Sequence, residues 1–362
     1  MKLFSQYTLG KLELKNRVVM APLTRSRAIN NIPNALMAEY YGQRSGGGLL
    51  ITEGTAPSAN GLGYARIPGV YSEAQIEGWK LVTEAVHAKG SKIFLQIMHT
   101  GRVSHPNNME EGTEVLAPSA VALEGEMYTD QEGPQAYPVP KAMSLEEIAR
   151  ERDSYIQAAK NAIAAGFDGV EIHGANGYLV DQFLNTATNK RTDEYGGSIE
   201  NRSRFALEVA KGVVEAIGAD RTGIRLSPYG VFNGIEIYEG IEDTYEYLAT
   251  ELGKLGLVYI HLVDHSPMGA PEVPRSVKGK IREAFSGSLI LSGGYDRERA
   301  DADLEADHAD LVAFGRPFLS SPDLVYRLKN GIAPNDPDMS TFYTPGEKGY
   351  TDYPFAEENV SA

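Results

Sequence analysis

The sequence predicts a (β/α)8 barrel, in which eight parallel strands alternate with eight helices. Short apolar runs alternate with longer amphipathic segments along the chain, a pattern typical of β–α units and a parallel sheet. Several short runs are apolar at consecutive positions, as expected for strands buried on both faces. With 362 residues, 42% of them hydrophobic, the chain can bury such a barrel as a single domain, residues 1–362.

The strands and helices are expected in strict alternation. The strands are expected at residues 17–21, 49–55, 92–98, 169–173, 222–227, 257–263, 288–292 and 310–315. The helices are expected at residues 35–44, 73–88, 145–165, 199–217, 243–255, 276–285, 297–305 and 323–330. Two helix starts carry capping boxes, Ser72 with Gln75 and Ser144 with Glu147, whose side chains satisfy backbone N–H groups at the helix N-terminus.

Three segments lie outside this alternation. Residues 7–15, with Gly10-Lys11 at the centre, predict an N-terminal hairpin before the first strand. Residues 100–143 form a long insertion after strand 3, rich in Gly, Pro and Glu. Its position places it at the C-terminal end of the barrel, where active sites of this fold lie, so it can form a lid. The C-terminal segment, residues 332–362, is expected to return to the same end.

Composition excludes several classes of function. The net charge of −15 argues against nucleic-acid and membrane-surface partners, which favour basic surfaces. The chain has no cysteine, so disulfides, a thiolate nucleophile and cysteine-held zinc or iron–sulfur clusters are excluded. No run approaches the roughly 20 apolar residues that span a bilayer, and the N-terminus lacks the apolar run of a signal peptide. We therefore expect a cytoplasmic protein.

The most informative segment is 166–179, where an apolar strand ends in three polar side chains among glycines. His173 and Asn176 can donate hydrogen bonds to an oxygen, and Tyr178 can supply a proton. From the residues alone, His173 also fits a metal ligand or a catalytic base, and each of the three fits a satisfied polar group in a core. No carboxylate cluster suited to a metal accompanies them at the strand ends, so no metal is expected.

Two further groups at the strand ends fit a cofactor. Gly293 and Gly294 follow the seventh strand, and Gly315 and Arg316 follow the eighth, where barrels of this kind commonly bind a phosphate. Gln96 and Arg225 are expected to point inward from different strands, where an amide and a permanent cation suit the polar edge of a flavin. The structural alternatives are simple turns at the glycines and an internal salt bridge at the arginine.

These residues resemble the Old Yellow Enzyme family of FMN-dependent ene reductases, most closely its bacterial branch, which includes nitrate-ester and enone reductases. The resemblance covers nearly the whole chain. Its motifs lie at residues 15–17, 20–25, 96–102, 167–179, 189–202, 225–228, 314–317 and 349–354. The chain departs from many relatives at Met98, where they carry tryptophan, and in the loop 264–275.

The resemblance implies a role for each site residue. It implies that the flavin ring contacts Pro22, Leu23, Thr24, Gly54, Gln96 and Arg225, and that the FMN phosphate contacts Gly293, Gly294, Gly315 and Arg316. It also implies that His173 and Asn176 bind the activating oxygen of the substrate and that Tyr178 donates the proton. Thr24 and Tyr343 are expected beside the substrate as well.

The function implied is the reduction of the activated C=C bond of an α,β-unsaturated carbonyl or nitro compound. Nitrate esters are implied as a further substrate class. The electron donor would be NADPH or NADH, the cofactor would be non-covalent FMN, and the protein would be a monomer or homodimer. Two alternatives remain open. One is an FMN-binding barrel with a different redox substrate, although no motif for a base that abstracts a substrate proton is present. The other is a flavin-binding sensor without catalysis.

Overall fold

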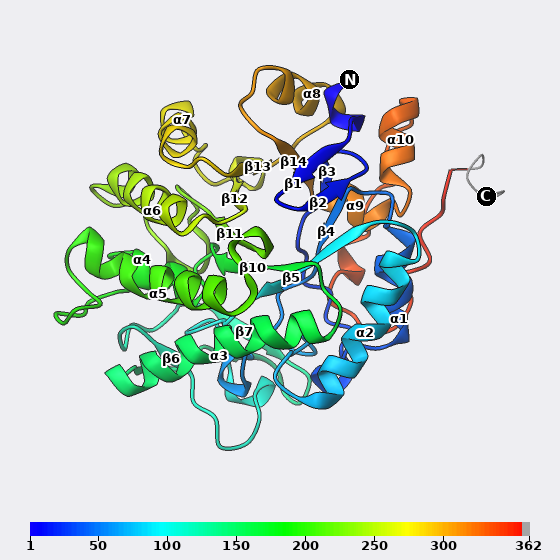
Figure 1. The fold of residues 1–362 in the computed structure, drawn as a ribbon. Coiled ribbons are helices and arrows are strands. Elements are labelled where there is room, and N and C mark those ends of the chain that lie inside the picture. The colour runs from blue at the N-terminus through cyan, green and yellow to red at the C-terminus, as the bar shows by residue number, and fades with distance from the viewer. Residues whose placement is uncertain (357–362) are drawn as a thin grey trace.

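The structure is a computed structural model that describes residues 1–356, and it confirms the (β/α)8 barrel (Figure 1). Each strand pairs in parallel with the next barrel strand along the chain, and β14 pairs with β3 to close the barrel. The strands are β3 Val18–Met20, β4 Leu49–Ile51, β5 Lys92–Ile97, β10 Gly169–Gly174, β11 Thr222–Leu226, β12 Tyr259–Val263, β13 Ser288–Ser292 and β14 Leu311–Phe314.

The eight expected helices are all present around the barrel (Figure 1). They are α1 Ala35–Gln43, α2 Glu73–His87, α3 Leu145–Ala164, α5 Ile199–Ile217, α6 Ile241–Leu255, α7 Arg275–Ala284, α8 Arg297–Glu305 and α10 Leu324–Asn330. Both predicted capping boxes form, with Ser72 accepting from Gln75 and Ser144 accepting from Glu147. No helix within residues 1–356 is both long enough and apolar enough to cross a membrane.

The second strand differs from its prediction, because it ends at Ile51 rather than at residue 55. The N–H of Thr52 donates to the carbonyl of Phe94, and the N–H of Thr55 donates to the carbonyl of Gln96. The two donors are three residues apart, whereas the two acceptors on β5 are only two residues apart. One extra residue therefore bulges out of the ladder between them, as in a β-bulge. The bulge accommodates Glu53, whose side chain is fully buried.

The structure contains several short helices and strands that the sequence did not predict. Two short helices, α4 Leu179–Leu184 and α9 Arg316–Ser320, follow the fourth and eighth barrel strands. The insertion 100–143 contains two small sheets, formed by β6 Leu116–Ala117 with β9 Lys141–Ala142 and by β7 Glu126–Thr129 with β8 Gly133–Ala136. These elements are too short to give a periodic pattern in the sequence.

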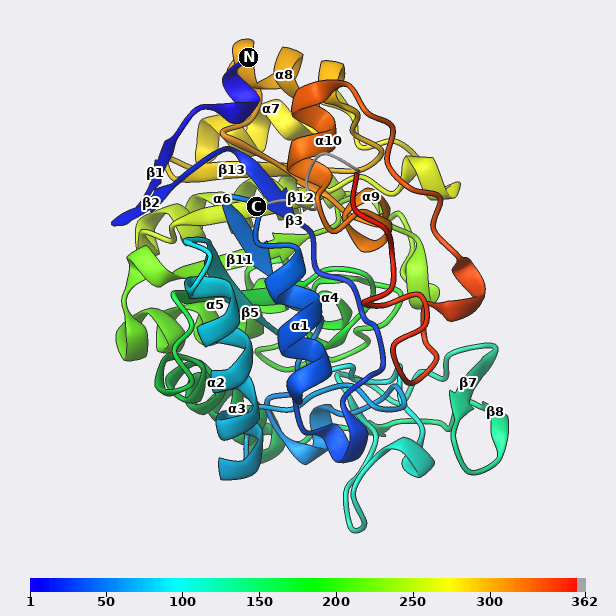
Figure 2. The ribbon, with the colours of Figure 1, turned by 90° about the vertical axis from the view of Figure 1, so that its right-hand side faces the viewer.

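The two ends of the barrel are covered differently. The predicted N-terminal hairpin, β1 Tyr7–Leu9 and β2 Leu12–Leu14, lies at the opposite end of the molecule from the β7–β8 hairpin of the insertion (Figure 2). The C-terminal segment returns to the barrel, as expected, where Arg25 and Arg27 donate hydrogen bonds to its carbonyls at Phe342. Residues 357–362 of that segment lie outside the described part of the chain.

The barrel interior changes from apolar to polar along its axis. An apolar cluster that includes Phe94, Tyr259, Ile290 and Leu311 fills it beside the N-terminal hairpin. Because side chains of a strand alternate between its faces, the residues two positions further along point inward as well, and on three of these strands they are polar. They are Gln96 on β5, His261 on β12 and Ser292 on β13, and all three are buried. This polar layer lies toward the C-terminal strand ends and forms the base of the candidate site.

Candidate active site

The loop after β10 turns sharply enough to place three side chains at one strand end. Asn176 has a φ of 60° and Gly177 a φ of 76°, both in the left-handed region. A Cβ atom on Gly177 would lie 2.7 Å from the carbonyl oxygen of Phe232, so only glycine fits. The N–H of Gly177 donates to Oδ2 of Asp181 at 2.9 Å, which fixes the turn. The predicted glycine-assisted turn is therefore present.

His173 is buried and presents a hydrogen-bond donor. Its Nδ1 accepts a hydrogen bond from the N–H of Ala175 at 3.3 Å. Burial, reinforced by the positive charge of Arg225 nearby, holds the pKa of His173 well below its usual value. The ring is therefore neutral near pH 7 with its proton on Nε2. A donor, rather than a base, is thus available from this ring at the strand end.

Tyr178 lies directly beside His173, with the two rings edge to face and their centroids 4.8 Å apart. Burial raises the pKa of Tyr178 to about 12, so the phenol keeps its proton at neutral pH. Its hydroxyl shares a hydrogen bond of 3.0 Å with the hydroxyl of Tyr64, which comes from the loop after β4. The geometry matches a proton donor with one hydroxyl partner.

Asn176 is held by three hydrogen bonds. Its backbone N–H donates to Oγ of Ser227 at 2.9 Å, and its carbonyl accepts from Nδ2 of Asn233 at 2.8 Å. Its side-chain Oδ1 lies 2.6 Å from Nε2 of His265, a residue of the loop 264–275 after β12. The amide Nδ2 has no hydrogen-bond partner among residues 1–356 and remains a free donor.

The polar layer beneath these residues is organised around Glu171, which is fully buried. One carboxylate oxygen accepts from Nε2 of Gln96 at 2.7 Å. The other lies 2.9 Å from Nδ1 of His261, whose pKa burial lowers below its usual value, so the neutral ring donates to the carboxylate. Gln96 therefore points inward, as predicted, with one amide hydrogen and its oxygen left for a ligand.

Arg225 lies level with His173 in the ladder and is almost completely buried, at 7% exposure. It forms no ion pair and donates no hydrogen bond to any residue of the described chain, and its Nε is buried without a partner. The alternative of an internal salt bridge is therefore not realised. A buried cation without a partner is costly, so this guanidinium fits the polar edge of an anionic or electron-rich ligand such as a flavin.

The glycines after the seventh and eighth strands leave backbone donors free. Gly293 and Gly294 have φ values of 128° and 62°, and a Cβ atom on Gly293 would lie 2.2 Å from the carbonyl oxygen of Asp264. Close packing against loop 264–275 thus requires glycine there. The N–H groups of Gly294, Gly315 and Arg316 donate to no described residue, and the Arg316 side chain is exposed. These free donors and the cation suit the phosphate of FMN.

The remaining predicted residues lie nearby in different settings. Leu23 contacts the region of Gly315, because a Cβ atom there would lie 3.8 Å from the Leu23 side chain. Pro22 is buried and Thr24 is half-buried, and the Thr24 hydroxyl forms no hydrogen bond within the described chain. Gly54 packs against Met98, whose Sδ would lie 2.4 Å from an added Cβ. Tyr343 is 62% exposed, so it lies at the rim rather than in the interior.

Three residues of the site were not predicted from the sequence. Glu171 has the same strand parity as His173, and that alternation was the signal that could have found it. His265 lies just after a strand end, but the sequence showed only that its loop diverges from relatives. Tyr64 carries no signal, because it reaches Tyr178 from a loop that no pattern places. Within residues 1–356, no group of His, Asp or Glu is placed to hold a metal ion.

Known proteins resemble this chain along its length. It matches the family model described as "NADH:flavin oxidoreductase / NADH oxidase family" over residues 2–335. It is 46% identical to a chanoclavine-I aldehyde reductase of Penicillium roqueforti (strain FM164), over 99% of this chain and 97% of the relative. It is 45% identical to a probable flavin mononucleotide-dependent alkene reductase of Leishmania infantum, over 96% of this chain and 95% of the relative.

Solved structures show the same fold. Morphinone reductase in complex with tetrahydroNAD has a TM-score of 0.95 to this structure, at 47% identity, over 100% of this chain and 99% of that one. An Old Yellow Enzyme homologue from Zymomonas mobilis has a TM-score of 0.92, at 40% identity, over 98% of this chain and 99% of that one. The chain therefore belongs to the NADH:flavin oxidoreductase / NADH oxidase family, as its resemblance to the FMN-dependent Old Yellow Enzyme family predicted.

Proposed function

We propose that this protein is an NAD(P)H-dependent ene reductase whose active site is the C-terminal end of the barrel. It reduces the activated C=C bond of α,β-unsaturated carbonyl or nitro compounds, and nitrate esters are a further substrate class. The observation that carries the site assignment is the group of unpaired donors there: the Arg225 guanidinium and Nε2 of His173. The relatives named as alkene and aldehyde reductases support the reaction class.

The cofactor is FMN, which when bound would supply the hydride, with NADPH or NADH as the electron donor. Gln96 and Arg225 bind the polar edge of its ring, with Pro22, Leu23, Thr24 and Gly54 around the ring. Gly293, Gly294, Gly315 and Arg316 hold the phosphate through free N–H groups and a cation. In this proposal residues 1–362 act as one FMN-binding domain, as a monomer or a homodimer.

His173 and Asn176 clamp the substrate oxygen. Negative charge develops on that oxygen as the β-carbon gains hydride, so donors aimed at it stabilise the transition state more than the ground state. Nε2 of the neutral His173 ring and Nδ2 of Asn176 are the two donors. In a buried site such hydrogen bonds are stronger than in water, because the local dielectric is low.

Tyr178 completes the reaction by giving its proton to the α-carbon. Its raised pKa, about 12, keeps the phenol protonated at neutral pH, and its contact with the His173 ring places it beside the oxygen clamp. Tyr343, at the rim, and Thr24 line the same space toward the substrate.

An anaerobic titration tests the proposed function. The purified protein should be yellow with FMN, should bleach when NADPH or NADH is added, and should recover its colour when cyclohexenone follows. A flavin that bleaches but ignores both the enone and a nitroalkene would indicate a different redox substrate. A flavin that ignores the nicotinamide donor would indicate a sensor, and a protein that cannot take up FMN would refute the proposal.

A further inference from the structure

The loop after β12 brings one histidine against the oxygen clamp. His265 is 8% exposed, and its Nε2 lies 2.6 Å from Oδ1 of Asn176. The ring packs edge to face against Phe232, with centroids 4.5 Å apart. Asn176 cannot move away as a unit, because Ser227 and Asn233 hold its backbone on both sides. The contact therefore acts on the side-chain amide alone.

An asparagine amide has an oxygen at one corner and an NH2 group at the other. A substrate oxygen that gains negative charge needs the NH2 group, whereas the amide oxygen would repel it. Burial, reinforced by the charge of Arg225, lowers the pKa of His265 to about 4, so the ring is neutral near pH 7. A neutral ring that carries its proton on Nε2 donates to Oδ1 and leaves Nδ2 facing the substrate.

We infer that His265 is a positioning residue that fixes the amide of Asn176 with its NH2 group toward the substrate oxygen. This inference rests on the proposed function, in which Asn176 is one half of the clamp. It assigns a role to the loop 264–275, for which the sequence predicted none. Without the His265 donor, the amide can rotate and present its oxygen, so only a fraction of molecules is competent for the reaction.

The test replaces the donor and keeps the ring. His265→Phe preserves the shape and the contact with Phe232 but cannot donate to Oδ1. The apparent affinity for a substrate scales with the competent fraction, so kcat/KM for cyclohexenone should fall at least about twofold and as much as about tenfold. The dissociation constant of the saturated ketone cyclohexanone, measured by its effect on the flavin spectrum, should rise by the same factor.

Two further variants, compared with His265→Phe, distinguish positioning from a structural role. His265→Gln supplies an amide donor at a similar reach and should recover kcat/KM to within about twofold of the parent. Phe232→Leu weakens the ring packing but keeps the hydrogen bond, so it should have a smaller effect than His265→Phe. FMN content and Tm should change little in all three. His265→Leu takes the place of His265→Phe if phenylalanine prevents folding.

A double-mutant cycle with Asn176→Ala decides the matter. Asn176→Ala alone should lower kcat/KM by about a hundredfold, as loss of one oxyanion donor does. If His265 acts through Asn176, adding His265→Phe to that variant should cost nothing more. If the losses in kcat/KM of the two single variants add in the double variant, or if His265→Phe leaves kcat/KM unchanged, the inference about His265 fails while the proposed function stands. If Asn176→Ala has no effect, the clamp of the proposed function fails, and the inference fails with it.

Discussion

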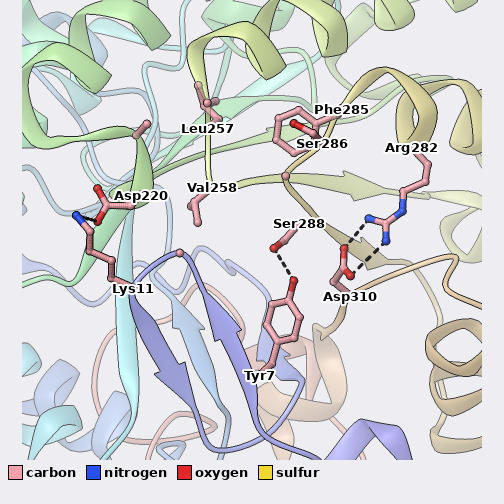
Figure 3. A pocket seen from close by; sticks show the side chains of 14 residues that line it. Tyr7, Lys11, Asp220, Leu257, Val258, Arg282, Phe285, Ser286, Ser288 and Asp310 are labelled. Atoms are coloured by element: carbon pink, nitrogen blue, oxygen red, sulfur yellow. Dashed lines mark hydrogen bonds and ion pairs between the residues drawn. The ribbon is translucent and has the colours of Figure 1, made fainter.

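The two ends of the barrel differ in how their charged groups are paired. At the N-terminal end, the lining of a hollow of 720 Å³ includes charged and polar side chains that pair with one another (Figure 3). Lys11 pairs with Asp220 at 3.0 Å, and Tyr7 shares a hydrogen bond of 2.7 Å with Ser288. At the C-terminal end, the Arg225 guanidinium is buried without a partner among residues 1–356.

The difference lies in the charged groups: Lys11 and Arg282 of the N-terminal hollow each have a carboxylate partner, whereas the buried Arg225 guanidinium has none within residues 1–356. The N-terminal hollow is spacious, but each of its two cations, Lys11 and Arg282, is paired with a carboxylate. The C-terminal end keeps buried donors unpaired, which costs stability unless a ligand completes them. The comparison predicts that changes at the C-terminal end affect binding and chemistry, whereas changes at the N-terminal end affect only stability.

The largest effect is expected from Tyr178→Phe. Removing a positioned general acid should slow enone reduction by about 10²- to 10⁴-fold, measured in single turnovers of the reduced protein. Flavin reduction by the nicotinamide donor should keep its rate. Tyr64→Phe is the matched control: it removes the hydroxyl that partners Tyr178 but leaves the acid in place, so its effect should be smaller. Full activity in Tyr178→Phe would show that the proton comes from another group.

The next effect concerns Asp181, which holds the turn of the site loop through Gly177. Burial raises the pKa of Asp181 from 3.8 to about 7. Between pH 3.8 and about pH 7, the Asp181 carboxyl keeps its proton in the folded protein but has lost it in the unfolded chain. The free energy of unfolding therefore falls as pH rises through that range. Over the whole interval the loss amounts to about 4 kcal/mol.

Asp181→Asn removes this titration and keeps an acceptor for the N–H of Gly177. Denaturant unfolding from about pH 4 to about pH 8 should therefore show a stability difference between variant and parent that shifts in favour of the variant as pH rises. A difference that stays constant over this range would mean that Asp181 is ionised throughout and that burial does not dominate its pKa.

Arg225→Met tests the unpaired cation directly. If its guanidinium holds the flavin through charge-assisted hydrogen bonds, FMN affinity should fall by about 1.5 to 3 kcal/mol, roughly ten- to a hundredfold. The stability of the FMN-free protein should hold steady or rise, because an unpaired buried charge is removed. Fluorescence titration with FMN and thermal unfolding of the apoprotein measure the two quantities. Unchanged FMN affinity would show that Arg225 does not contribute to binding the cofactor.

Arg282→Met is the counterpart at the N-terminal end and should have the smallest effect. Arg282 forms a two-point contact with Asp310, at 2.6 and 3.2 Å, and both side chains are partly exposed. Its loss should cost about 1 kcal/mol or less in unfolding free energy. FMN affinity and kcat/KM should match the parent. A loss of FMN binding in this variant would contradict the division between the two ends.

The sequence predicted the order of the barrel elements because each strand and helix carries its own hydrophobic period. It also predicted that polar side chains following different strands lie at one end of the barrel, since parallel strands bring their C-terminal ends to one face. It could not predict the bulge at Glu53, because one extra residue in a ladder leaves no periodic trace. The residues contributed from distant loops, Tyr64 and His265, depend on how the loops pack, which no local pattern encodes.

The crystal structure of the FMN complex with cyclohexanone, a saturated substrate analogue, tests the central claim most directly. The account predicts the flavin at the C-terminal end, with Gln96 and Arg225 on the polar edge of its ring and its phosphate on Gly315 and Arg316. It predicts the ketone oxygen within hydrogen-bond distance of Nε2 of His173 and Nδ2 of Asn176. A flavin bound elsewhere, or a ketone oxygen that touches neither donor, would contradict the account.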